Sequence, residues 1–142
     1  MRMPLDAAAA RPVRGANGSP GPVVRVLVAD DSVAFQRAAA QVIEVSPGFE
    51  LAATASTGEE AIGLIEQVHP DLVLLDVRMP GMGGIEAAGR IAAWDSDVQV
   101  VLLSGGPREE APGMAGSALP YLSKSQFGPD ALRTLWRNRI PH

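Results

Sequence analysis

Five polar or charged residues stand where apolar runs of this chain end. In the stretch "VRVLVADDSVAFQR", apolar side chains lead directly into Asp30 and Asp31. A third acid, Asp76, ends "LVLLD", while Ser104 ends "VVLLS" and Lys124 ends "YLSK". Taken alone, each has an ordinary interpretation as a helix cap, a turn residue, a loop hydroxyl or a surface charge. Their chemistry depends on whether the fold brings them together.

The segments between these residues follow an alternating pattern. Five short apolar runs predict buried strands, at residues 23–29, 49–55, 71–76, 98–103 and 119–124. The intervening segments have helical spacing, clearest at Ala61, Ile65 and Val68, and Thr57 with Glu60 predicts a capping box at the start of that helix. Buried strands separated by helices favour a parallel sheet with right-handed crossovers. The sequence therefore predicts a doubly wound α/β domain of five βα units.

Two regions depart from this pattern. Residues 1–22 are rich in Pro, Gly and Ala without hydrophobic periodicity, which predicts a disordered tail ahead of a domain covering residues 23–140. Residues 105–120 contain two internal prolines and four glycines, which predicts a short or distorted fourth helix. No apolar run approaches the ~18 residues of a membrane span. A four-alanine run broken by Arg11 is too short for the core of a signal peptide.

The predicted sheet brings the strand-end residues to one edge. In parallel α/β sheets, ligand sites form beyond the carboxyl ends of the strands. Three carboxylates meeting there would repel one another unless a cation joined them, and Mg²⁺ prefers oxygen ligands of this kind. Asp30 and Asp31 are thus predicted to hold Mg²⁺, leaving an oxygen of Asp76 able to attack phosphorus. Ser104 can bond the transferred group, and Lys124, the only lysine, supplies positive charge.

Four motifs, "VADDS", "LLDVRMPGMGG", "VVLLSGG" and "YLSK", together resemble the response-regulator receiver domain of two-component signalling. The likeness runs from Val23 to about Arg139, and the chain is expected to be a stand-alone, CheY-like receiver. It implies a flavodoxin-like fold with a five-stranded parallel sheet of order 2-1-3-4-5. It also implies that a sensor histidine kinase or a phosphotransfer protein delivers a phosphoryl group to the domain.

The resemblance assigns a role to each position of the motifs. Asp76 matches the phosphoacceptor, and Asp30 and Asp31 match the acidic pair that holds Mg²⁺ with Asp76. The backbone carbonyl of Arg78 is a further implied ligand. Two more roles concern switching: Ser104 matches the switch hydroxyl and Tyr121 the aromatic that changes rotamer on activation. Lys124 matches the lysine of the family pattern.

Two residues depart from the family pattern. Ser125 stands where receivers commonly carry a proline after the lysine, so the loop carrying Lys124 is expected to be set differently. Gly83 replaces a polar residue of the family's turn before the third helix. With the shortened fourth helix, these departures concern the signalling face rather than the phosphorylation chemistry.

Composition and charge argue against several kinds of binding partner. A net charge of -4 and an aromatic content of 4% argue against direct nucleic-acid binding. No cysteine and only two histidines argue against disulfides and a zinc centre. Because 18 residues follow Lys124, we expect a cytoplasmic receiver without its own output domain, acting on a separate protein partner, with a phosphorylation-dependent homodimer as a further expectation.

Three alternatives stay open at this point. One is a receiver-like interaction module that works without phosphorylation. Another is a fragment of a longer DNA-binding transcriptional regulator, whose receivers have similar motifs. The third is a phosphatase with an aspartate nucleophile, which ranks lowest because such hydrolases commonly place a second acid two residues later, where this chain has Arg78.

Overall fold

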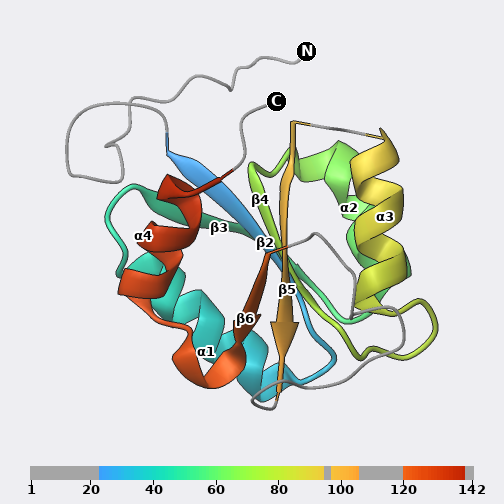
Figure 1. Cartoon of the computed structure of the whole chain (residues 1–142), viewed down its shortest axis with the longest axis horizontal. Helices are drawn as coiled ribbons and strands as arrows, with labels where there is room; N and C mark the ends of the chain where they lie inside the picture. Colours follow the sequence, from blue (N-terminus) through green and yellow to red (C-terminus); the bar gives the residue numbers. More distant parts are fainter. Residues whose placement is uncertain (1–22, 95–96, 106–119, 140–142) are drawn as a thin grey trace.

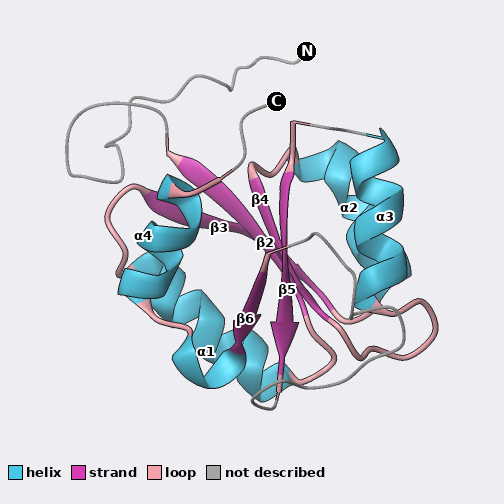
Figure 2. Cartoon of the chain, viewed as in Figure 1, coloured by secondary structure: helices cyan, strands magenta, loops and turns pink. Residues whose placement is uncertain are grey.

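A computed structural model describes residues 23–94, 97–105 and 120–139 (Figure 1). The sheet consists of β2 (Val24–Ala29), β3 (Phe49–Ala55), β4 (Leu72–Asp76), β5 (Gln99–Ser104) and β6 (Tyr121–Ser123). The helices are α1 (Val33–Glu44), α2 (Gly58–Val68), α3 (Gly84–Trp94) and α4 (Pro129–Arg137), with a 3₁₀ turn η1 (Lys124–Gln126) after β6. Helices cover both faces of the sheet, α1 and α4 on one side and α2 and α3 on the other (Figure 2).

All strand pairs are parallel, and the strand order is β3-β2-β4-β5-β6. Numbered along the chain this is 2-1-3-4-5, which confirms the predicted flavodoxin-like fold. The order changes direction beside β2, because β3 lies on one side of it and β4 on the other. Ligands of open α/β sheets bind at such a point, so the ends of β2 and β4 are where a site is expected.

Each face of the sheet has its own apolar core. Leu27, Val73 and Leu75 face α2 and α3, where they pack with residues such as Ile65 and Ile91. Their neighbours along the strands face the other way and pack against α1 and α4, in a second cluster that includes Val26, Val28, Leu74, Ile43 and Leu132. Successive side chains of a strand point to opposite faces. Strands covered on both faces must be apolar throughout, which explains the unbroken runs in the sequence.

Two helices begin where local sequence signals predict. Thr57 caps α2 by accepting a hydrogen bond from the Glu60 N–H at 3.0 Å, while the Glu60 carboxylate accepts from Ser56 N–H at 2.8 Å, one residue earlier than in a standard capping box. Pro129 occupies the first turn of α4.

The last strand is shorter than predicted. We expected it to reach Lys124, but β6 ends at Ser123 and Lys124 begins η1. The cause is local, because Ser123 Oγ lies 3.4 Å from the backbone N–H of Ser125 and accepts from it, turning the chain away from the sheet. A proline at 125 could not donate this bond. Ser125 therefore supplies a backbone donor in this loop that a proline would lack, and a different loop setting in relatives with proline stays a prediction.

Two predictions fall beyond the described part of the chain. The tail over residues 1–22 and the weak helix predicted within 105–120 lie outside the described residues, apart from Gly105 and Pro120 at its two ends. The domain boundaries at 23 and 140 also stay predictions. Across residues 23–94, 97–105 and 120–139, no helix has the length and apolar character needed to span a membrane.

Candidate functional site

Three aspartates meet at the carboxyl edge of the sheet. Asp30 follows β2, Asp31 follows it, and Asp76 is the last residue of β4. One carboxylate oxygen from each lies within 4.8 Å of the others. Asp30 is fully buried and Asp76 is 5% exposed, whereas Asp31 is exposed to solvent. The convergence that the strand-end positions predict is present.

The turn after β2 keeps Asp30 in place without using it as the cap of α1. Its Oδ1 accepts a hydrogen bond from the backbone N–H of Ser32 at 2.8 Å. Ser32 then caps the helix, because its Oγ accepts from the Phe35 N–H at 3.2 Å. Helix capping therefore does not explain the adjacent acids, and Asp30 Oδ2 faces the acid cluster.

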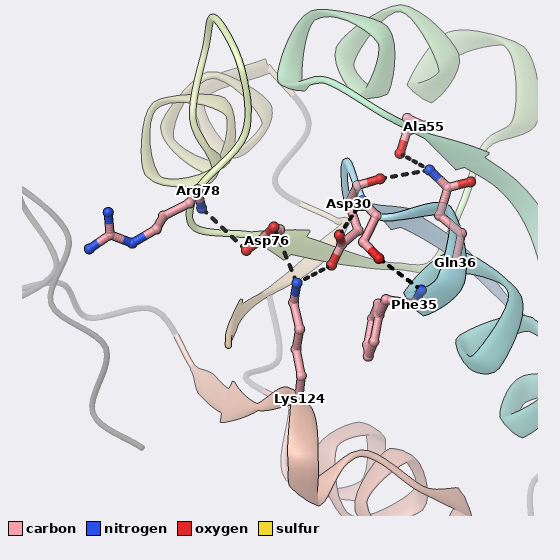
Figure 3. Close-up of polar contacts among 8 residues, drawn as sticks. Asp30, Phe35, Gln36, Ala55, Asp76, Arg78 and Lys124 are labelled. Atoms are coloured by element: carbon pink, nitrogen blue, oxygen red, sulfur yellow. Dashed lines mark hydrogen bonds and ion pairs between the residues drawn. The ribbon is translucent and has the colours of Figure 1, made fainter. Parts of the chain in front are cut away.

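Gln36 connects this turn to the next strand. Its side-chain amide donates to the carbonyl of Asp30 at 2.6 Å and to the carbonyl of Ala55 at 3.2 Å (Figure 3). It also donates to Ser56 Oγ at 3.1 Å. It therefore joins the ends of β2 and β3. Gln36 was not predicted, because a lone glutamine in a helical turn carries no motif that would identify it.

Lys124 extends its ammonium group into the acid cluster from η1. Its Nζ lies 2.5 Å from Asp30 Oδ2 and 3.3 Å from Asp76 Oδ2 (Figure 3). The side chain is 20% exposed, so water screens these contacts only in part. Lys124 therefore bridges the two buried acids.

Burial and charge set the protonation of this group. Burial raises the pKa of Asp76, and the nearby charge of Asp30 adds to the rise. Hydrogen bonds from the Arg78 N–H and from Lys124 lower the pKa of Asp76 but do not outweigh burial. Burial lowers the pKa of Lys124, yet its contacts with Asp30 and Asp76 more than offset this and leave that pKa raised. One ammonium group thus does not fully compensate the acids around it.

The remaining predicted site residues are Ser104, Tyr121 and Arg78, and they differ in how close they lie to the acids. Ser104 is the buried last residue of β5, and in register its preceding residue, Leu103, pairs with Asp76. Ser104 therefore lies at the same edge. Tyr121 is half-buried at the opposite, amino end of β6. The Arg78 N–H donates to Asp76 Oδ1 at 3.2 Å, which places the Arg78 peptide beside the acids, while the Arg78 side chain points away from them (Figure 3).

The loop between β4 and α3 fits closely against its surroundings. A Cβ on Gly84 would lie 2.2 Å from the carbonyl oxygen of Asp76, and a Cβ on Gly58 would lie 2.6 Å from that of Met82. Glu59 accepts a hydrogen bond from the Met82 N–H at 3.2 Å. The two glycines and Glu59 thus let the loop after Asp76 lie directly against the start of α2.

The site fits a hard divalent cation. Asp30 Oδ2 is buried and contacts the Lys124 ammonium at 2.5 Å. A buried carboxylate oxygen of this kind, with two further carboxylates in reach, provides the oxygen donors that Mg²⁺ prefers. Asp30, Asp31 and Asp76 would hold the ion.

A 2-1-3-4-5 parallel sheet with an acid cluster and a lysine at its carboxyl edge defines a receiver-type α/β signalling domain. The family model for the response regulator receiver domain matches residues 26–136, and this chain belongs to that family. Receiver domains generally bind Mg²⁺ at an acidic pocket and interact with histidine kinases or phosphotransfer proteins.

Known proteins similar to this chain include an enzyme, a transcriptional regulatory protein and a CheX-CheY complex, as their names state. A protein-glutamate methylesterase/protein-glutamine glutaminase 2 of Anaeromyxobacter dehalogenans (strain 2CP-C) is 39% identical over 62% of this chain and 26% of its own length. The transcriptional regulatory protein DegU of Brevibacillus brevis is 32% identical over 57% of this chain and 34% of its own. The chain thus spans about a quarter to a third of these relatives. A CheX-CheY-BeF₃-Mg²⁺ complex from Borrelia burgdorferi is similar in structure, with a TM-score of 0.69, 26% identity, and coverage of 85% of this chain and 90% of that one.

Proposed function

We propose that this chain is the phosphoacceptor receiver of a two-component phosphorelay, with Asp76 as the residue that takes the phosphoryl group. The observation that carries this proposal is the setting of the Asp76 carboxylate. It lies at the sheet edge with one oxygen bonded by Arg78 N–H and the other by Lys124, and it shares the edge with Asp30 and Asp31. A sensor histidine kinase or a phosphotransfer protein is the proposed donor.

Each residue of the site has a separate role in the proposed phosphoryl transfer. An Asp76 oxygen attacks phosphorus, the bond between phosphorus and the donor's histidine nitrogen breaks, and that nitrogen keeps the electron pair and takes up a proton. The raised pKa of Asp76 keeps its carboxylate basic and therefore nucleophilic. Lys124 and Ser104 bind the oxygens of the transferred group. Mg²⁺, when bound by Asp30, Asp31, Asp76 and the Arg78 carbonyl, neutralises negative charge that would repel the incoming phosphoryl group.

The expected output is a change in a protein-interaction surface. Ser104 at the end of β5 and Tyr121 at the start of β6 lie on adjacent strands, so a movement of Ser104 toward a phosphoryl group would be felt along β6. We propose a separate protein as the downstream partner in the cytoplasm, without direct nucleic-acid contact, and self-association of the phosphorylated form as a further route. The only catalysis proposed for this chain is its own phosphorylation and dephosphorylation.

A second candidate is a receiver that forms part of a longer regulator. The observation that favours it is length, because the methylesterase and DegU are each far longer than the region they share with this chain. A module that acts without phosphorylation is less favoured, because it would give no reason for the buried Asp30 carboxylate beside Asp76 and Lys124.

Phosphorylation with a small-molecule phosphodonor tests the proposal. The wild-type protein, incubated with acetyl phosphate and Mg²⁺, should gain one aspartyl phosphate, detected as a mass increase that mild alkali removes. Asp76→Asn keeps the shape but removes the nucleophile, so its labelling should fall to background. Asp130→Asn, a change of the same kind at an exposed acid of α4, should be labelled normally. Full labelling of Asp76→Asn, or none of the wild type, would overturn the assignment.

A further inference from the structure

The Lys124 ammonium has a third neighbour besides the two acids, the ring of Phe35. Nζ lies over this ring at 5.0 Å from its centroid, within the range of a cation–π contact. Figure 3 shows the ring beside the Lys124 side chain, with Asp30 and Asp76 at its tip. The ammonium group therefore has an aromatic face on one side and carboxylates ahead of it.

Phe35 is held by the same turn that holds the acids. Its backbone N–H is bonded by the capping oxygen of Ser32, and the N–H of Ser32 is bonded by Asp30. Two consecutive hydrogen bonds thus connect Asp30 to the first turn of α1. The backbone of Phe35 is therefore held near the carboxylates that Lys124 contacts.

The ring also contacts the turn from which Lys124 projects. Phe127 lies 6.1 Å from Phe35 between ring centroids, with the ring planes tilted by 50°. The Phe127 N–H donates to the carbonyl of Lys124 at 3.2 Å, closing η1. Phe35 therefore contacts the Lys124 ammonium group directly and is linked to the Lys124 backbone through Phe127.

A lysine needs such support to act at a defined place. Its ammonium group sits on a flexible four-carbon chain with many rotamers, and it forms no planar, bidentate pair as arginine does. During transfer it must exchange the Asp30 carboxylate for the oxygens of the phosphoryl group. The uncharged ring attracts the ammonium without competing with the phosphoryl group for it. It can therefore restrict the conformations of the Lys124 side chain without preventing this exchange.

We propose that Phe35 is a positioning residue for phosphoryl transfer, which keeps the Lys124 ammonium beside Asp76 through its aromatic face. This inference rests on the proposed function, since it concerns the rate at which Asp76 is phosphorylated. Phe35 acts through Lys124 and does not itself touch the reacting atoms. An aromatic side chain at this position should serve, and an aliphatic one of similar size should not.

The contact can be observed directly, because Lys124 is the only lysine in the chain. Protein labelled with ¹³C-lysine gives one set of side-chain signals in an NMR spectrum, free of overlap from other lysines. In the wild type, the ε-methylene protons should be shifted upfield by the ring current of Phe35. Phe35→Leu should abolish this shift and Phe35→Tyr should keep it. Phe35→Met provides a second non-aromatic variant if Phe35→Leu does not fold.

The rate of phosphorylation then tests the role. At saturating acetyl phosphate and Mg²⁺, the limiting rate should fall about fivefold in Phe35→Leu, which is the factor a contact of this type typically supports, and stay within about twofold of wild type in Phe35→Tyr. Phe49→Leu is the matched control, since it removes a ring of the same size at the start of β3, at the amino edge of the sheet and away from the ammonium. It should stay within about twofold of wild type, and Mg²⁺ affinity should be unchanged in all variants.

The results separate this inference from the function on which it rests. A wild type that gains no phosphate would overturn the proposed function and this inference with it. A wild type that is phosphorylated at the same rate as Phe35→Leu and Phe35→Met would overturn only the role of Phe35. So would equal losses in Phe35→Leu and Phe49→Leu, which would indicate a general packing defect, or wild-type ε-methylene protons without an upfield shift.

Discussion

At the scale of single residues, the site is a balance between burial and charge at Asp76. For a carboxyl group whose pKa is higher in the folded than in the unfolded state, the folded protein binds more protons between the two pKa values. Its contribution to stability therefore falls as pH rises through that interval. At neutral pH the ionised, buried Asp76 opposes folding, even with Lys124 as its partner.

Asp76→Asn is accordingly expected to stabilise the metal-free protein. At pH 7 to 8 the variant should melt at a higher temperature than wild type, because no buried charge is left at position 76. The difference should shrink as the pH falls through the raised pKa of Asp76, because the wild-type carboxyl group then becomes protonated and uncharged. Thermal melts in EDTA from pH 4 to 8 measure this. A variant that melts lower than wild type at pH 8 would contradict it.

The residues of the site differ in how far the sequence could predict them. Asp30, Asp76 and Lys124 each end or follow an apolar run, and the geometry of a parallel sheet then brings them to one edge. Gln36 and Phe35 were not predicted, because their importance lies in side chains that reach between elements. Gln36 contacts the end of β3, and Phe35 contacts Lys124, which lies 89 positions later in the chain (124 minus 35). No local spacing encodes such contacts.

At the scale of elements, α3 contains two glycines with opposite requirements. Gly84 begins the helix, and a Cβ there would lie 2.2 Å from the Asp76 carbonyl oxygen, a backbone atom that cannot move aside easily. Gly89 is exposed in the same helix, and a Cβ there would meet nothing within 4 Å. The contrast separates a glycine that the site needs from one that only weakens the helix.

Gly84→Ala should lower the free energy of unfolding by roughly 2–3 kcal/mol or more, because the methyl group forces the backbone around Asp76 to shift. Gly89→Ala should raise it by about 0.8–1 kcal/mol, since alanine favours the helix. Urea denaturation of the two variants and the wild type provides the comparison. If both changes altered stability in the same direction, the close approach of α3 to Asp76 would be in doubt.

Gln36 tests how the elements around the acids are joined. Gln36→Leu removes the donor that bridges the ends of β2 and β3, and it should cost about 1–2 kcal/mol of stability. Because Asp30 then loses a support on its carbonyl, Mg²⁺ binding should also weaken. Gln41→Leu makes the same change at an exposed position of α1 and should leave both quantities nearly unaltered. Calorimetric titration with Mg²⁺ and urea denaturation measure the two effects.

The elements themselves were largely predictable, with one instructive exception. Strand and helix positions follow from apolar periodicity because β2, β4 and β5 are covered on both faces. The end of β6 did not follow from it, since the side chain of Ser123 bonds the backbone of Ser125 and turns the chain one residue earlier. A local side-chain bond decided this boundary, and hydrophobic pattern carries no information about it.

At the scale of the whole molecule, the sheet order connects folding to function. Because β2 and β4 are neighbours at the point where the order changes direction, the acids at their ends meet only when the complete central sheet has formed. A ligand that binds these acids together therefore binds the folded chain and not the unfolded one. Binding of this kind stabilises the entire domain by mass action.

Mg²⁺ is therefore expected to raise the melting temperature of the whole domain in proportion to the logarithm of its concentration. At 100 times its dissociation constant the gain is about 2.7 kcal/mol, enough for a shift of several degrees in a domain of this size. Asp31→Ala should remove most of the shift, and because Asp31 is exposed the variant should otherwise stay folded. Asp130→Ala, at an exposed acid on α4, should keep it, and EDTA should reverse it. A shift that survives in Asp31→Ala, or that appears equally with Na⁺ at the same ionic strength, would mean that the three aspartates do not form the metal site.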